Sequence, residues 1–143
     1  MPFCTRISAF FILTALVSEL VTEPVSRAQA PSQPVSNSLS VQEMLVVTEI
    51  ETLKPIGVAE SFPSTVGKLF CFTKITGART DTLVRHLWFY GDRLISEVSL
   101  PVRRINWRTY SSQTIQPKWT GSWRVDVTAE DGTLLKSVGF TIE

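Results

Sequence analysis

The sequence has few of the side chains that form metal centres and nucleophilic active sites. Its 143 residues include one histidine, His86, and two cysteines, Cys4 and Cys71. A zinc site needs three or four His, Cys or carboxylate ligands, and a catalytic triad needs a serine beside a histidine base. No Gly-x-Ser-x-Gly, Walker or dinucleotide-binding motif occurs. We therefore expect no metal, no cofactor, no catalytic residue and no enzyme activity. A small hydrolase that uses acidic side chains is the weakest hypothesis kept.

An excess of charge of one sign is also missing. The chain has 14 Lys and Arg against 13 Asp and Glu, a formal net charge of +1. Nucleic-acid-binding domains usually show a clear basic excess, so we expect no nucleic-acid partner. The composition is 43% apolar and 19% charged, which is typical of a globular protein.

The one long apolar run lies near the N-terminus, at residues 7–17. Arg6 precedes it and Ala28-Gln29-Ala30 has the form of a cleavage site, so residues 1–30 are predicted to be a signal peptide or an uncleaved N-terminal anchor. We expect an exported protein, periplasmic or extracellular, whose membrane contact, if any, is through this segment. The Ser- and Pro-rich residues 31–43 predict a flexible linker. Without the leader Cys71 is the only cysteine, and its apolar neighbours indicate a buried, inert thiol.

Residues 44–143 show the alternation of β-strands and no helical periodicity. Asp131-Gly132 and Gly91-Asp92-Arg93 are typical of hairpin connections, and residues 54–57 predict a turn or loop. The pattern predicts an antiparallel β-sandwich of about seven strands, immunoglobulin-like in size, with a small β-barrel as the alternative. The predicted strands span residues 44–52, 66–75, 83–90, 94–102, 105–115, 121–130 and 134–142.

An ordered set of motifs spans residues 46–143. In chain order they are Lys54-Pro55, Phe70-Cys71-Phe72-Thr73, His86-Leu87-Trp88, Trp107-Arg108-Thr109-Tyr110-Ser111-Ser112, Trp119-Thr120-Gly121-Ser122-Trp123, Asp131-Gly132 and Phe140. Taken together, they resemble a bacterial family catalogued as domain of unknown function 2914. The resemblance implies an exported or membrane-tethered β-domain with no established reaction, and hence no family catalytic residues.

The aromatic residues on the predicted strands allow two interpretations. His86, Trp88 and Trp123 belong either to the core or to an exposed aromatic ridge that stacks sugars or docks a protein. The inward orientation of Trp88 is favoured, because the opposite orientation would bury Arg85. In that orientation His86 would bond to backbone or to a serine.

A second group is the candidate binding set, which combines basic and aromatic side chains. Its members are Arg103, Arg104, Arg108, Tyr110 and Trp119. The arginines could hold anionic or polar groups and the aromatics supply flat apolar area, although basic loops are often simply solvated. Trp119 is either a plug at the end of the core or a ligand-stacking residue. The first hypothesis is a non-enzymatic, exported module that binds a protein or a cell-envelope glycan, and the second is a structural or scaffolding domain at the envelope.

Overall fold

The structure is a computed structural model that describes residues 38–143. The predicted leader, and the linker as far as residue 37, lie outside the described residues. Within the described part the chain forms nine strands and no helix that is long and apolar enough to cross a membrane. The strands are β1 (Ser40–Glu51), β2 (Lys54–Val58), β3 (Ser61–Phe62), β4 (Lys68–Thr76), β5 (Thr82–Tyr90), β6 (Arg93–Val102), β7 (Asn106–Thr114), β8 (Gly121–Ala129) and β9 (Leu134–Ile142).

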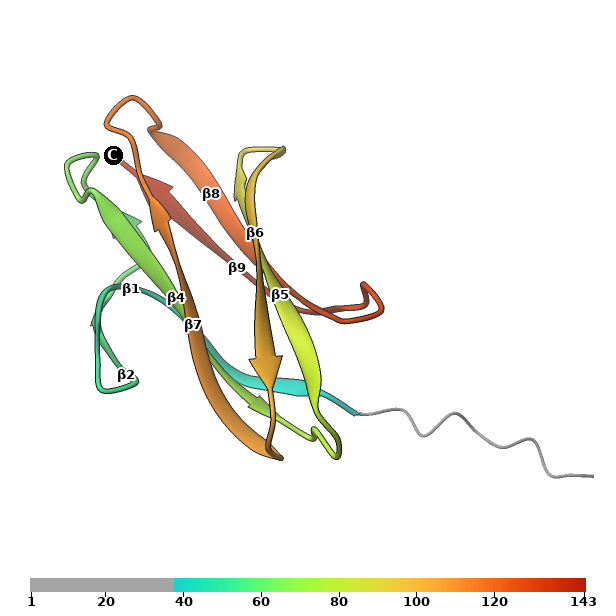
Figure 1. Ribbon diagram of the computed structural model, residues 1–143. Coiled ribbons are helices and arrows are strands. Elements are labelled where there is room, and N and C mark those ends of the chain that lie inside the picture. Colours follow the sequence, from blue (N-terminus) through green and yellow to red (C-terminus); the bar gives the residue numbers. More distant parts are fainter. Residues whose placement is uncertain (1–37) are drawn as a thin grey trace, which may run out of the picture. The chain divides into compact units, whose positions relative to one another are not determined.

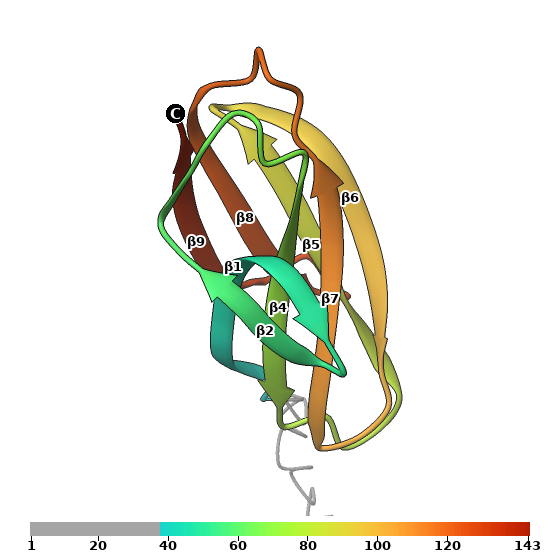
Figure 2. The ribbon, with the colours of Figure 1, turned by 90° about the vertical axis from the view of Figure 1, so that its left-hand side faces the viewer.

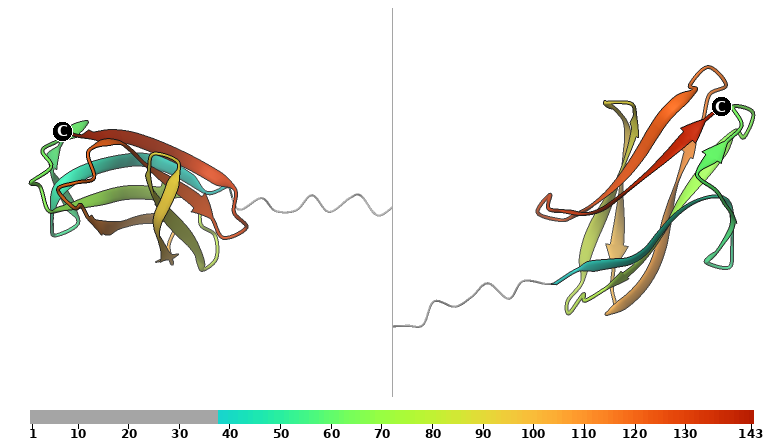
Figure 3. Two further views of the ribbon diagram at one scale, coloured as in Figure 1. Left: turned by 90° about the horizontal axis from the view of Figure 1, so that it is seen from above. Right: turned by 180° about the vertical axis from the view of Figure 1, so that it is seen from behind.

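The strands form two sheets that pack as separate layers (Figure 1, Figure 3). The four-stranded sheet has the order β2-β1-β4-β7, and the five-stranded sheet has the order β3-β9-β8-β5-β6. All pairs are antiparallel except β3 with β9. The sheets do not close on each other, so the predicted β-sandwich is confirmed and the barrel alternative is wrong.

The core lies between the sheets and is built from alternate residues of each strand. On β4, Leu69, Cys71 and Ile75 are fully inaccessible to solvent, and Val125 and Val127 of β8 face them from the other layer. This alternation follows from the two-residue period of side chains along a strand. Cys71 is thus buried, as its sequence context indicated.

Two strand boundaries differ from the sequence prediction. Strand β1 begins at Ser40, so the end of the predicted linker belongs to the sheet. The predicted turn at residues 54–57 is wrong, because Lys54–Val58 is strand β2 and the turn is Thr52 and Leu53. Pro55 fits in β2 because β2 is an edge strand, where a missing N–H donor costs no ladder hydrogen bond.

Candidate functional site

The single histidine lies in the core, in a hydrogen-bonded group that joins the two sheets. Strand β5 points His86 and Trp88 inward, and both are fully buried. The Nδ1 atom of His86 lies 2.7 Å from the Ser111 Oγ of β7, and Nε2 lies 3.2 Å from the Thr73 Oγ1 of β4. The indole Nε1–H of Trp88 donates to the same Ser111 Oγ over 3.0 Å. Trp88 is therefore in the core and is not part of an exposed ridge.

The donors fix which ring nitrogen of His86 holds the proton. An indole N–H can only donate, so Ser111 accepts from Trp88. Among the described hydrogen bonds the Ser111 proton has no acceptor other than His86 Nδ1, so Ser111 donates to that nitrogen. The ring proton then sits on Nε2 and is donated to Thr73, whose hydroxyl donates to the Thr109 carbonyl at 3.4 Å. Each buried polar side-chain atom of the described residues has a partner. Each hydroxyl and ring proton of this group has an acceptor only when His86 is neutral.

Burial keeps the ring neutral and closes it to substrates. Desolvation lowers the pKa of His86 from 6.5 to about 4. Ser111 beside His86 has the atoms of a nucleophile–base pair, but both ring nitrogens are already bonded and Ser111 is only 4% exposed. Every described Asp and Glu is at least partly exposed. The core group therefore holds the sheets together and has no visible route to a substrate.

Two further tryptophans, Trp119 and Trp123, close one end of the sandwich. Trp119 packs against Tyr90 and Trp123, with ring centroids 6.2 and 5.8 Å away. The Nε1–H of Trp123 donates to the Trp119 carbonyl, and the Tyr90 hydroxyl donates to the Thr120 carbonyl at 2.7 Å. Trp123 is 2% exposed and contacts Phe140 of the core. Of the two interpretations of Trp119, these contacts fit the plug.

The outer face of the four-stranded sheet, which points away from the five-stranded sheet, is different in character. Because Thr109 and Ser111 face the core, Arg108 and Tyr110 between them face outward, and both are exposed. Strand β1 pairs with β4 only as far as Val47 and with β2 from Val47 onward. Beyond that point the β1–β2 hairpin bends across β4 (Figure 2). Its tip lies beside Arg108 of β7, the strand on the far side of β4.

The bend is visible in the packing beneath the hairpin. Val47 and Phe72 are on the outer face, yet they are 0% and 2% exposed and lie outside the main core. Gly57 permits the close approach of the hairpin strands, because its φ is +76° and a Cβ there would collide with the Thr48 hydroxyl. A small second apolar layer therefore holds the hairpin on the sheet.

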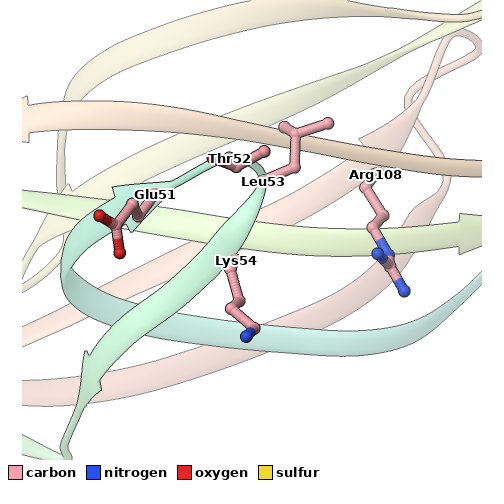
Figure 4. A pocket seen from close by; sticks show the side chains of 5 residues that line it. All are labelled: Glu51, Thr52, Leu53, Lys54 and Arg108. Carbon is pink, nitrogen blue, oxygen red and sulfur yellow. The ribbon is translucent and has the colours of Figure 1, made fainter.

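An open depression of about 360 Å³ lies between the hairpin tip and β7. It is lined by Glu51, Thr52, Leu53, Lys54 and Arg108 (Figure 4). In this view the side chains of Lys54 and Arg108 extend to the same side. Lys74 of β4 is opposite Arg108 in the strand register and thus on the same face.

The cations on the two outer faces have different partners. On the five-stranded sheet, Arg85 pairs with Glu97 at 3.2 Å, and Arg124 pairs with Asp126 at 3.0 Å and covers the Phe89 ring. These are the two ion pairs within the described residues, and neither involves Lys54, Lys74 or Arg108. The cations of the four-stranded sheet therefore lack an ion-pair partner in the described part of the chain.

The structure brings together only part of the predicted binding set. Arg108 and Tyr110 share one face of β7, whereas Arg103 and Arg104 precede the strand and Trp119 follows it, so these residues lie at opposite ends of β7. Nine strand residues span roughly 30 Å, so Trp119 cannot share a small ligand with the two loop arginines. Lys54 and Leu53 were missed, because the Pro-Gly signal in residues 54–57 predicted a loop and nothing local indicates that the hairpin bends over β7.

These features define a β-sandwich domain. Buried hydrogen bonds link its two sheets through the core, and one outer face has cations without an ion-pair partner among the described residues. Residues 81–142 match the model of a family described as Protein of unknown function (DUF2914). The match covers strands β5 to β9, and the motifs of residues 46–80 lie outside it. Comparison with the curated proteins finds no match to the chain.

Proposed function

We propose that the protein is a non-enzymatic, exported module that binds a protein or a cell-envelope glycan through the outer face of its four-stranded sheet. The contrast between the two outer faces is the observation that supports this most. One face neutralises its arginines internally, while the other leaves Lys54, Lys74 and Arg108 without an ion pair beside the exposed Tyr110. Unpaired cations next to an aromatic ring are suited to contact a partner.

In the test, the full chain and its variants are each immobilised and incubated with solubilised cell-envelope protein and glycan. The amount that each variant retains is then measured. Arg108→Ala combined with Tyr110→Ala should reduce retention at least tenfold, since both side chains are exposed and their loss leaves the core intact. Lys136→Ala, an exposed cation on β9, is the matched control and should bind normally. Equal retention by both variants, or unfolding of the double variant in circular dichroism, would contradict the proposal.

A structural or scaffolding domain is the second candidate, because edge strand β2 exposes Ile56 and Val58 at 37% and 56%. Edge strands with exposed apolar side chains can pair with another chain. Size-exclusion chromatography separates the two functions. A dimer that Val58→Lys dissociates would favour scaffolding, and a monomer at all concentrations would argue against self-assembly.

A further inference from the structure

We infer that the depression between the hairpin tip and β7 binds the acidic group of an anionic glycan. This rests on the proposed function and names its ligand class. The carboxylate or phosphate would lie between the Lys54 Nζ and the Arg108 guanidinium, and the adjoining sugar ring would lie on Tyr110.

The cations around the depression have no counter-ion among the described residues, which favours binding of an external anion. Lys54 and Arg108 extend to the same side in Figure 4, and Lys74 adds a third cation in register with Arg108. Like charges gathered without counter-ions repel one another and cost stability. Glu51 is opposite Lys54 in the β1–β2 register and lines the same depression, but it forms no ion pair with either cation. An anion from outside supplies the missing counter-charge, and a guanidinium can bind it with two parallel hydrogen bonds.

The size and lining favour a charged sugar over a protein partner. The centres of protein interfaces are depleted of Lys, Asp and Glu, whereas small-ligand sites have volumes of roughly 300–1,000 Å³. This depression holds about 360 Å³ and is lined by Lys54, Arg108 and Glu51 together with Thr52 and Leu53. A few sugar residues with one acidic group fit such a space and such polarity.

Tyr110 provides the surface for the sugar ring. It lies two residues after Arg108 on the same face of β7, which places the two about 7 Å apart along the strand. The ring is 40% exposed, and Phe70 packs edge-on against it with centroids 6.0 Å apart. An aromatic ring held in this way offers a rigid apolar surface at little entropic cost.

The hairpin turn fixes the backbone position of Lys54 before a ligand arrives. Thr52 and Leu53 both have positive φ, 51° and 56°, which non-glycine residues rarely adopt. Such strain tends to occur where a geometry serves binding. A preformed cation position reduces the entropy lost on binding.

The experiment is isothermal titration calorimetry of the full chain with trigalacturonate, maltotriose and penta-glutamate. Trigalacturonate should bind, and its affinity should fall as salt rises because the contacts are exposed. Lys54→Gln and Arg108→Gln should each weaken it about tenfold, which corresponds to one charge-assisted hydrogen bond. Tyr110→Ala should weaken it by a similar factor. Lys136→Gln on β9 is the control and should change nothing.

Each other outcome overturns the inference in a recognisable way. Equal binding of maltotriose that Tyr110→Ala abolishes would leave a glycan-binding module but remove the acidic group from its ligand. Tighter binding of penta-glutamate would indicate an acidic protein partner. Trigalacturonate binding that Lys54→Gln and Arg108→Gln leave intact would place its site elsewhere. If no probe binds while envelope retention still depends on Arg108 and Tyr110, the inference fails and the proposed function stands.

Discussion

At the residue scale, His86 shows how a buried polar side chain can be fully accommodated in a β-sandwich. Its two ring nitrogens have opposite roles, one accepting from Ser111 and one donating to Thr73, so the surroundings admit one tautomer of the neutral ring. Protonation would make both nitrogens donors and leave the Ser111 hydroxyl proton without an acceptor. His86 therefore has a structural role, and its contribution to the stability of the folded protein depends on pH.

The pH dependence follows from the lowered pKa. Between about pH 6.5 and 4 the unfolded chain binds a proton on His86 that the folded protein does not. The contribution to stability is therefore complete above pH 6.5 and is lost as the pH falls toward 4. The unfolding free energy should drop by about 3 kcal/mol more in the protein than in His86→Gln over this range. Urea denaturation at several pH values measures this, and parallel curves for the two proteins would refute it.

Ser111 should be the more sensitive of two adjacent serines. Ser111→Ala removes the partner of both His86 and Trp88 and leaves two buried groups unpaired, which should cost about 2–4 kcal/mol. Ser112→Ala on the outer face is the control and should cost less than about 0.5 kcal/mol. Chemical denaturation compares them, and similar losses at the two positions would show that the core group adds little.

At the element scale, the β1–β2 hairpin is the element for which the sequence prediction differs most from the structure. Alternation and hairpin signals such as Asp131-Gly132 were enough to predict all seven of the longer strands and their antiparallel fold. They could not reveal β2, because its turn uses Thr52 and Leu53 where glycine or asparagine is expected. Nor could a local pattern reveal that the tip reaches Arg108, since that contact depends on the packing of Val47 and Phe72. Arg108 and Tyr110 were predictable as an exposed pair, and Lys54 was not.

Substitutions in the β1–β2 turn should raise the stability of the protein but lower its affinity for the ligand. Replacing Thr52→Asn and Leu53→Gly together supplies residues that adopt positive φ readily, so stability should rise by about 1–2 kcal/mol. The greater freedom at the tip should also weaken trigalacturonate binding. Thermal denaturation tests the first effect and calorimetry the second. A loss of stability in the variant would mean that Leu53 packing outweighs the backbone strain.

At the scale of the whole molecule, the outer faces of the two sheets differ in how their arginines are paired. The five-stranded sheet pairs Arg85 and Arg124 with carboxylates, whereas Arg108 of the four-stranded sheet has no ion pair within the described residues. The strand order of the two sheets could not be predicted from sequence, because the pairs β1–β4 and β5–β8 join segments far apart in the chain. Such non-local pairing is decided by the fit of the complete core and not by any one segment.

Cys71 reports on opening of the whole sandwich. It is 0% exposed in the centre of the core, and burial raises the pKa of its thiol. In a chain with Cys4→Ser, labelling by a thiol reagent should be at least a thousandfold slower than for a free thiol and should accelerate with urea as the protein unfolds. Adding Ser112→Cys should create a second, fast phase as an internal control. Rapid labelling of Cys71 without urea would show local opening of β4.

The bonds of His86 to Thr73 and Ser111 have a further consequence for how the sheets can move. The apolar contacts around them are non-directional, so by themselves they would tolerate a small sliding of one layer over the other. Hydrogen bonds from one ring to two neighbouring strands lose their geometry with such a shift. The imidazole, together with the Trp88 indole that also bonds Ser111, thus helps to set the alignment of the layers and the position of edge strand β7, which carries Arg108 and Tyr110.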